Sequence, residues 1–93
     1  MLSTGDLPSV LNQTWEGRSQ WYNIGLNLGT SVGSLEAVRR NHRDVCEECY
    51  STVLREWLRE HPRPTWSALA DALRAPSVGM SHIAEQLPNS AKL

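Results

Sequence analysis

The chain has 93 residues, of which 40% are hydrophobic and 20% are charged, a composition typical of one globular domain and not of a disordered segment. Nine basic residues stand against ten acidic ones, which gives a net charge of −1. The strong positive excess of a typical nucleic-acid-binding domain is therefore missing. Eight of the nine basic residues are arginines, and because arginine is enriched and lysine depleted at protein interfaces, this favours an interaction protein.

Cysteine usage and hydropathy bear on where the protein is found. Only Cys46 and Cys49 are present, too few for the disulfide framework of a small secreted domain. The first residues have neither the basic start nor the apolar run of a signal peptide. No apolar stretch approaches the roughly 18 residues that a membrane span needs. We therefore expect a cytoplasmic protein without membrane insertion.

The first half of the chain predicts three helices, at residues 6–15, 18–28 and 32–42. In each of them, apolar residues recur three or four positions apart, which is the spacing of one helix face. These apolar residues are Leu7, Val10 and Leu11, then Trp21, Ile24 and Leu28, then Val32, Leu35 and Val38. Asp6 is placed to cap the first helix, and Gly29 can end the second in a left-handed conformation. The third is expected to be short and weakly specified.

The strongest helical pattern spans residues 44–61. Asp44 followed by Glu47 resembles a capping box, with Asp in place of Ser or Thr. Apolar and polar pairs then alternate, and the apolar pairs are Val45-Cys46, Cys49-Tyr50, Val53-Leu54 and Trp57-Leu58. Because this period of four exceeds 3.6, each step turns the apolar stripe by roughly 40° around the helix. A winding stripe faces several neighbours, so we expect this helix at the centre of a bundle.

Two further helices complete the predicted fold. The fifth begins after Thr65, which can cap it, and ends before Pro76. The sixth covers residues 79–87. We expect residues 1–93 to form a single domain with a helical core at about 6–87 and a short flexible tail at 88–93.

These segments together predict an all-α antiparallel bundle, since no strand pattern or internal repeat occurs between them. The apolar stripes indicate which side chains form its core. The predicted core residues are Trp21, Leu28, Leu35, Cys49, Leu54, Trp57, Leu58, Trp66, Leu69 and Leu73. For Trp15, at the end of the first helix, both packing and an exposed contact role remain open.

Four pieces of the sequence occur in an order and with gaps that resemble the death domain. They are Trp21-x-x-Ile24-Gly25-x-x-Leu28-Gly29, Leu35-x-x-Val38, Cys49-x-x-x-Val53-Leu54-x-x-Trp57-Leu58 and Thr65-Trp66-x-x-Leu69-x-x-Ala72-Leu73. The resemblance covers residues 7–87, nearly the whole chain. It implies a six-helix Greek-key bundle that binds other death-domain proteins homotypically. Such domains are non-enzymatic modules that assemble signalling platforms for apoptosis, innate immunity or inflammation, with signal-dependent oligomers as a further expectation.

The cysteines and histidines are the side chains that could take part in catalysis or metal binding, but their pattern indicates structural roles. Cys46 and Cys49 form a C-x-x-C pattern, but a zinc site needs a second pair of ligands, for which only His42 and His61 are candidates. A thioredoxin-like site needs a preceding strand, which this sequence lacks. His82 and the other histidines have no nucleophile at a recognisable catalytic spacing. We interpret both cysteines as structural and expect no catalytic residue, metal or cofactor.

Charged residues between positions 39 and 59 are the predicted interaction surface. For any one of them, a simple solvated surface is the alternative interpretation. The residues are Arg39, Arg40, Arg43, Asp44, Glu47, Glu48, Arg55, Glu56 and Arg59. The main alternative function is a small helical nucleic-acid-binding domain, in which the three arginines at 39–43 contact phosphates. The near-neutral charge and the acidic residues beside those arginines count against it.

Overall fold

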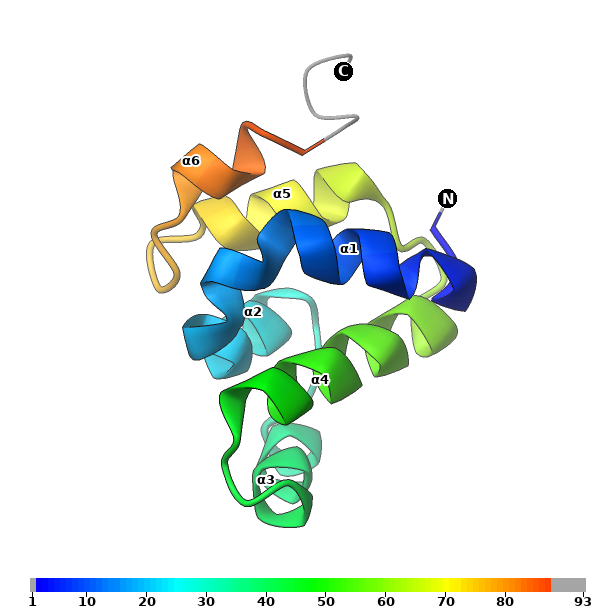
Figure 1. Ribbon diagram of the computed structural model, residues 1–93, viewed down its shortest axis with the longest axis vertical. Coiled ribbons are helices and arrows are strands. Elements are labelled where there is room, and N and C mark those ends of the chain that lie inside the picture. The colour runs from blue at the N-terminus through cyan, green and yellow to red at the C-terminus, as the bar shows by residue number, and fades with distance from the viewer. Residues whose placement is uncertain (1, 88–93) are drawn as a thin grey trace.

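The computed structural model describes residues 2–87, and every regular element within them is a helix (Figure 1). The α-helices are α1 (Leu7–Thr14), α2 (Trp21–Asn27), α3 (Val32–Asn41), α4 (Cys46–Glu60), α5 (Trp66–Arg74) and α6 (Ser81–Ala84). The 3₁₀ segments η1 (Thr4–Asp6) and η2 (Trp15–Gln20) flank α1. The all-α prediction is confirmed for this part of the chain, and the predicted tail at 88–93 lies outside the described residues. None of the helices in residues 2–87 combines the length and apolar character that a bilayer span requires.

Several helix boundaries differ from the prediction. α2 begins at Trp21, because residues 18–20 belong to η2. α6 ends at Ala84, although Leu87 beyond it is still buried. α3 has ten residues and lies within the predicted range of 32–42, although its sequence is weakly specified for a helix. The hydroxyl of Ser31 accepts the backbone N–H of Ser34 at 3.2 Å, and this cap offsets the weak helix-forming residues that follow it.

The three predicted caps have different outcomes. Thr65 caps α5 as expected, since its hydroxyl accepts a backbone N–H of the first turn at 3.1 Å. Asp6 precedes α1, but its carboxylate accepts the N–H of Ser3 at 2.8 Å and caps nothing in α1. The capping box predicted at Asp44 is wrong. Val45 precedes α4, and Asp44 adopts the left-handed region with φ of 61°, so its side chain is not placed to cap the helix.

α4 occupies the centre of the fold. It packs against α1, α2, α3 and both 3₁₀ segments. Its buried residues form three adjacent pairs, Cys49-Tyr50, Val53-Leu54 and Trp57-Leu58. Because the pairs recur every four residues, the buried stripe turns around the helix and faces successive neighbours. This confirms the central position expected from the alternating pattern.

All ten predicted core side chains are buried and belong to one apolar cluster. The three tryptophans among them are at most 8% exposed. Trp15 differs, with 37% of its surface exposed, and the guanidinium of Arg18 lies 5.1 Å from its ring centroid. The structure therefore places Trp15 at the surface, in contact with a cation.

The placement of α3 depends on two glycines around the end of α2. A Cβ atom on Gly25 would lie 2.7 Å from Leu35 of α3 and 3.2 Å from Val53 of α4. A larger residue at this position would require the side chains of Leu35 and Val53 to shift. Gly29 has φ of 97° and ends α2 as expected. α3 then lies at one end of the molecule and α6 at the other (Figure 1).

The first prediction concerns Trp57, which is 4% exposed and whose indole N–H has no acceptor among the described residues. Trp57→Ala should lower the free energy of unfolding by about 3–5 kcal/mol, because it empties the middle of the core. Trp57→Phe should cost much less, since it keeps most of the packing and removes a buried donor whose desolvation costs about 1–3 kcal/mol. Denaturant unfolding of the three proteins measures both values. A Phe variant as unstable as the Ala variant would contradict this account.

Candidate interaction surface

The predicted charged surface centres on residues 39–45, here called the α3–α4 corner. The N–H of Arg43 donates to Arg40 O at 3.4 Å, and that of Asp44 donates to Arg39 O at 2.9 Å. This is the hydrogen-bond pattern of a Schellman helix ending. Arg43 has φ of 53° and Asp44 has φ of 61°, where glycine is the usual residue. Such backbone conformations persist only where the surrounding structure determines them, so the corner is a sharply defined turn.

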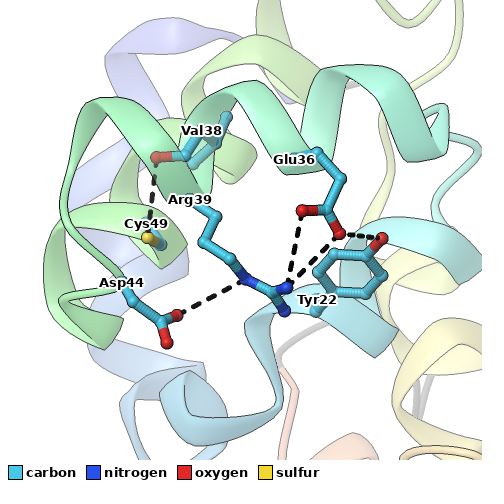
Figure 2. Close-up of polar contacts among 6 residues, drawn as sticks. All are labelled: Tyr22, Glu36, Val38, Arg39, Asp44 and Cys49. Atoms are coloured by element: carbon cyan, nitrogen blue, oxygen red, sulfur yellow. Dashed lines mark hydrogen bonds and ion pairs between the residues drawn. The ribbon is translucent and has the colours of Figure 1, made fainter.

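Arg39 is bound within the molecule (Figure 2). Its guanidinium lies 3.3 Å from Glu36 Oε2 and 3.7 Å from Asp44 Oδ1. The same group lies 4.9 Å from the ring centroid of Tyr22 and 5.9 Å from that of Trp21. The Tyr22 hydroxyl donates to Glu36 Oε2 at 2.9 Å, and this hydrogen bond is the main cause that raises the pKa of Tyr22. Arg39 therefore joins α2, α3 and the corner and serves the fold.

The predicted acidic residues also have partners within the chain. Glu47 Oε2 lies 3.7 Å from Arg18 Nε of η2. Glu48 Oε1 lies 3.3 Å from His42 Nδ1, and the other ring nitrogen of His42 lies 3.1 Å from the Thr52 hydroxyl. The His42 contacts attach the corner to α4, whereas the Glu47–Arg18 pair joins α4 to η2 and the Arg39–Asp44 pair lies within the corner. They leave little unpaired negative charge at this end of the molecule.

Arg40, Arg43 and Arg55 are different from the other predicted residues. All three are exposed, and none forms an ion pair with another residue of the described range. Arg59, by contrast, contacts two neighbouring glutamates of α4. The structure thus divides the predicted surface into internally paired charges and three free arginines. Two of the three, Arg40 and Arg43, lie on the α3–α4 corner.

A groove of about 560 Å³ lies between α3 and the second half of α4. Ser34 and Ala37 line it from α3, and Trp57 lines it from α4. Glu56 and Glu60 also line it, towards the C-terminal end of α4. The sequence does not predict this groove. No local signal could indicate it, because its lining residues come from the end of α2, α3 and α4 and lie far apart along the chain.

The two cysteines occupy the first turn of α4. Cys49 is fully buried, and its Sγ lies 3.9 Å from the carbonyl oxygen of Val38 (Figure 2). Burial is the main cause that raises the pKa of the Cys49 thiol, followed by the negative charge of Asp44. Cys46 is partly exposed. Within residues 2–87, no group of three histidine, cysteine or acidic side chains is placed to hold a metal ion. Cys49 thus packs as a small apolar side chain.

Comparison of the chain with protein-family models, with curated proteins and with solved structures gives no match.

The division between paired and free arginines predicts unequal effects at two adjacent positions. Arg39→Ala removes two ion pairs and two ring contacts, and should lower the free energy of unfolding by about 1 kcal/mol. Arg40→Ala removes no ion pair, and should change it by less than about 0.5 kcal/mol. Urea unfolding of both variants, which replace the same residue type in the same helical turn, provides the measurement. Equal stabilities would show that the Arg39 contacts contribute nothing.

The burial of the cysteines predicts their reactivity. A thiol-alkylating reagent should modify Cys46 first, and Cys49 roughly tenfold or more slowly, because its thiol is buried and its pKa is raised. Mass spectrometry of the partly reacted protein gives the two rates, and the Cys46→Ser variant isolates the slower one. Unfolding in urea should make the rates similar. Equal rates in the folded protein would contradict the packing of Cys49.

Proposed function

We propose that this chain is a death domain, a six-helix Greek-key bundle that acts as a non-enzymatic interaction module in cytoplasmic signalling. It binds other death-domain proteins homotypically and contributes to assemblies in apoptosis, innate immunity or inflammation. The helix order and the central position of α4 support this proposal. It is also supported by the burial in one core of the tryptophans and leucines that carry the resemblance.

The observation that carries the proposal is the pair of free arginines on the α3–α4 corner. Arg40 and Arg43 are exposed, while Arg39 between the same elements is bound internally. The guanidinium fork pairs with carboxylates in a bidentate geometry. The corner is a defined turn, so ordering it on binding costs little entropy. These properties suit a rigid surface that recognises carboxylates of a partner protein.

A nucleic-acid-binding domain is the alternative, because free guanidinium groups also bind phosphates. The acidic Glu47 and Glu48 follow the corner directly along the chain, and they would repel a phosphate backbone. The net charge of −1 also gives no general attraction to nucleic acid. We therefore favour a protein partner.

Reversal of the corner charges tests the proposal. In the double variant Arg40→Glu with Arg43→Glu, helicity should be unchanged, because neither side chain has an ion pair to lose. Its binding to the death domains that the unchanged chain recognises, including its own copies, should fall by about tenfold or more, since complementary charges set partner choice and association rate. Circular dichroism and surface binding against a panel of purified death domains provide the two measurements.

The control is Arg63→Glu with Arg74→Glu, which changes the net charge equally but away from the corner. Because Arg74 lies 3.8 Å from Asp71, circular dichroism also checks that this variant folds. This control should bind as the unchanged chain does. Equal loss of binding in both double variants would mean that the corner has no special role. Salt-sensitive binding to duplex DNA, without binding to any death domain, would support the nucleic-acid alternative and refute the proposal.

A further inference from the structure

We infer that Cys46 and Cys49 form a reversible disulfide bond in response to hydroperoxides, and that this bond changes the first turn of α4. In the structure both thiols are free, so it describes the reduced state of the pair. Such a modification site goes beyond the proposed function and is independent of it, because it depends only on the two thiols and their surroundings.

Helix geometry brings the two cysteines within reach of each other. They are three residues apart in the first turn of α4, and this spacing places two Cα atoms about 5 Å apart in an α-helix. Disulfide-bonded cysteines usually have Cα atoms about 4.4–6.8 Å apart. The charge of Cys46 is also one of the causes that raise the pKa of the Cys49 thiol, so the two sulfur atoms lie within electrostatic range of each other.

The two thiols differ in access to solvent, which gives them different roles. Cys46 is partly exposed, whereas Cys49 is fully buried. Burial is the main cause that raises the pKa of the Cys49 thiol. A hydroperoxide in solution therefore reaches Cys46 first, while Cys49 stays a protonated thiol beneath it. An accessible cysteine beside a second cysteine that can resolve it is the arrangement of a redox-sensing site.

The surroundings of Cys46 leave it open to reaction. It is the first residue of α4, and no side chain caps this end of the helix. The free N–H groups of a first turn stabilise nearby anions. Glu47 and Glu48 follow directly and oppose this effect, but the Arg18 guanidinium lies 3.7 Å from Glu47, and the His42 ring lies 3.3 Å from Glu48. These contacts offset part of the negative charge beside the thiol.

The reaction has two steps. The sulfur of Cys46 attacks one oxygen of the hydroperoxide and the O–O bond breaks. The thiol proton passes to the departing oxygen, which leaves a sulfenic acid at Cys46 and a molecule of water or alcohol. The sulfur of Cys49 then attacks that of Cys46, and its proton joins the departing hydroxide as water. The two sulfurs are oxidised and the peroxide is reduced. Two molecules of a small thiol such as glutathione reverse the bond by exchange and are themselves oxidised to a disulfide.

Closing the disulfide requires the first turn to change. Cβ atoms three residues apart in a helix lie about 5–6 Å from each other, whereas they lie about 3.5–4.5 Å apart across a disulfide. Cys49 is held by its surroundings, since its Sγ lies 3.9 Å from Val38 O of α3 (Figure 2) and its N–H donates to Val45 O at 2.9 Å. The bond therefore displaces at least one cysteine and disturbs the contact between α3 and α4. Disulfides under strain are also the ones most easily reduced.

Hydrogen peroxide is the probe for the folded chain. Trypsin cleaves after Arg43 and Arg55, so both cysteines lie in the peptide 44–55. After treatment, mass spectrometry should show that this peptide has lost two hydrogen atoms, and glutathione should restore them. Cys46→Ser should react about tenfold more slowly or less, because only the buried thiol remains. Cys49→Ala should react as fast as the unchanged chain but stop at the sulfenic acid, which dimedone traps.

Hydrogen exchange measures the conformational response. In the oxidised chain, the amides of residues 45–50 should exchange about tenfold faster than in the reduced chain, because the first turn opens more often. The amides of α5 should not change, since α5 packs mainly against α6 and α2. Circular dichroism shows whether the variants fold. If Cys49→Ala does not fold, the slow reaction of Cys46→Ser and the mass of peptide 44–55 carry the test.

Three results would overturn the inference. The first is a product other than the intramolecular bond, either dimers linked by disulfides or a sulfinic acid at Cys46 with Cys49 unmodified. The second is a Cys46→Ser variant that reacts as fast as the unchanged chain. The third is hydrogen exchange that does not change when the bond forms. None of these results affects the proposed function, which the binding experiment on Arg40 and Arg43 tests separately.

Discussion

The burial of α4 is the constraint on which the other elements depend. This helix packs against α1, α2 and α3 through one winding apolar stripe, so that stripe places all three. The contact with α1 also has a polar component, because the hydroxyl of fully buried Tyr50 donates to Thr14 Oγ1, which in turn donates to Val10 O at 2.8 Å. Burial raises the pKa of Tyr50 to about 12, so this hydroxyl stays neutral at physiological pH. A helix held in this way provides a rigid axis for the rest of the molecule.

The contacts of the surface charges depend on the position of α4. The α3–α4 corner is attached to α4 through His42, Glu48 and Thr52, and to α2 through Arg39. The ion pairs that make these attachments are individually weak because they are exposed. Their main effect is on specificity, since they neutralise the acidic residues of the corner and leave Arg40 and Arg43 unpaired. On a surface that carries both signs of charge, Arg40 and Arg43 are therefore arginines without an ion pair among the described residues.

The groove beside this axis runs from Asn41 and His42 of the corner to Glu60 and His61 at the C-terminal end of α4. Weak, exposed charges such as that of Glu60 favour rapid and salt-sensitive association over high affinity.

The sequence by itself determined the helical class, the central helix and the core. Apolar residues at helical spacing report burial directly, because the period of a helix depends only on local backbone geometry. The sequence-based prediction was wrong where one segment can form either of two local structures. Residues 18–20 can form an α-helix or a 3₁₀ helix, and Asp44 can cap a helix or adopt a left-handed turn. Contacts with distant residues decide between the two. Only the tertiary structure decided which charges are free. Arg39 and Arg40 are adjacent residues of the same type, yet Arg39 reaches the rings of α2 and two carboxylates, whereas Arg40 reaches none of them. The groove, likewise, lies between two helices, and helix-to-helix distance has no counterpart in local sequence.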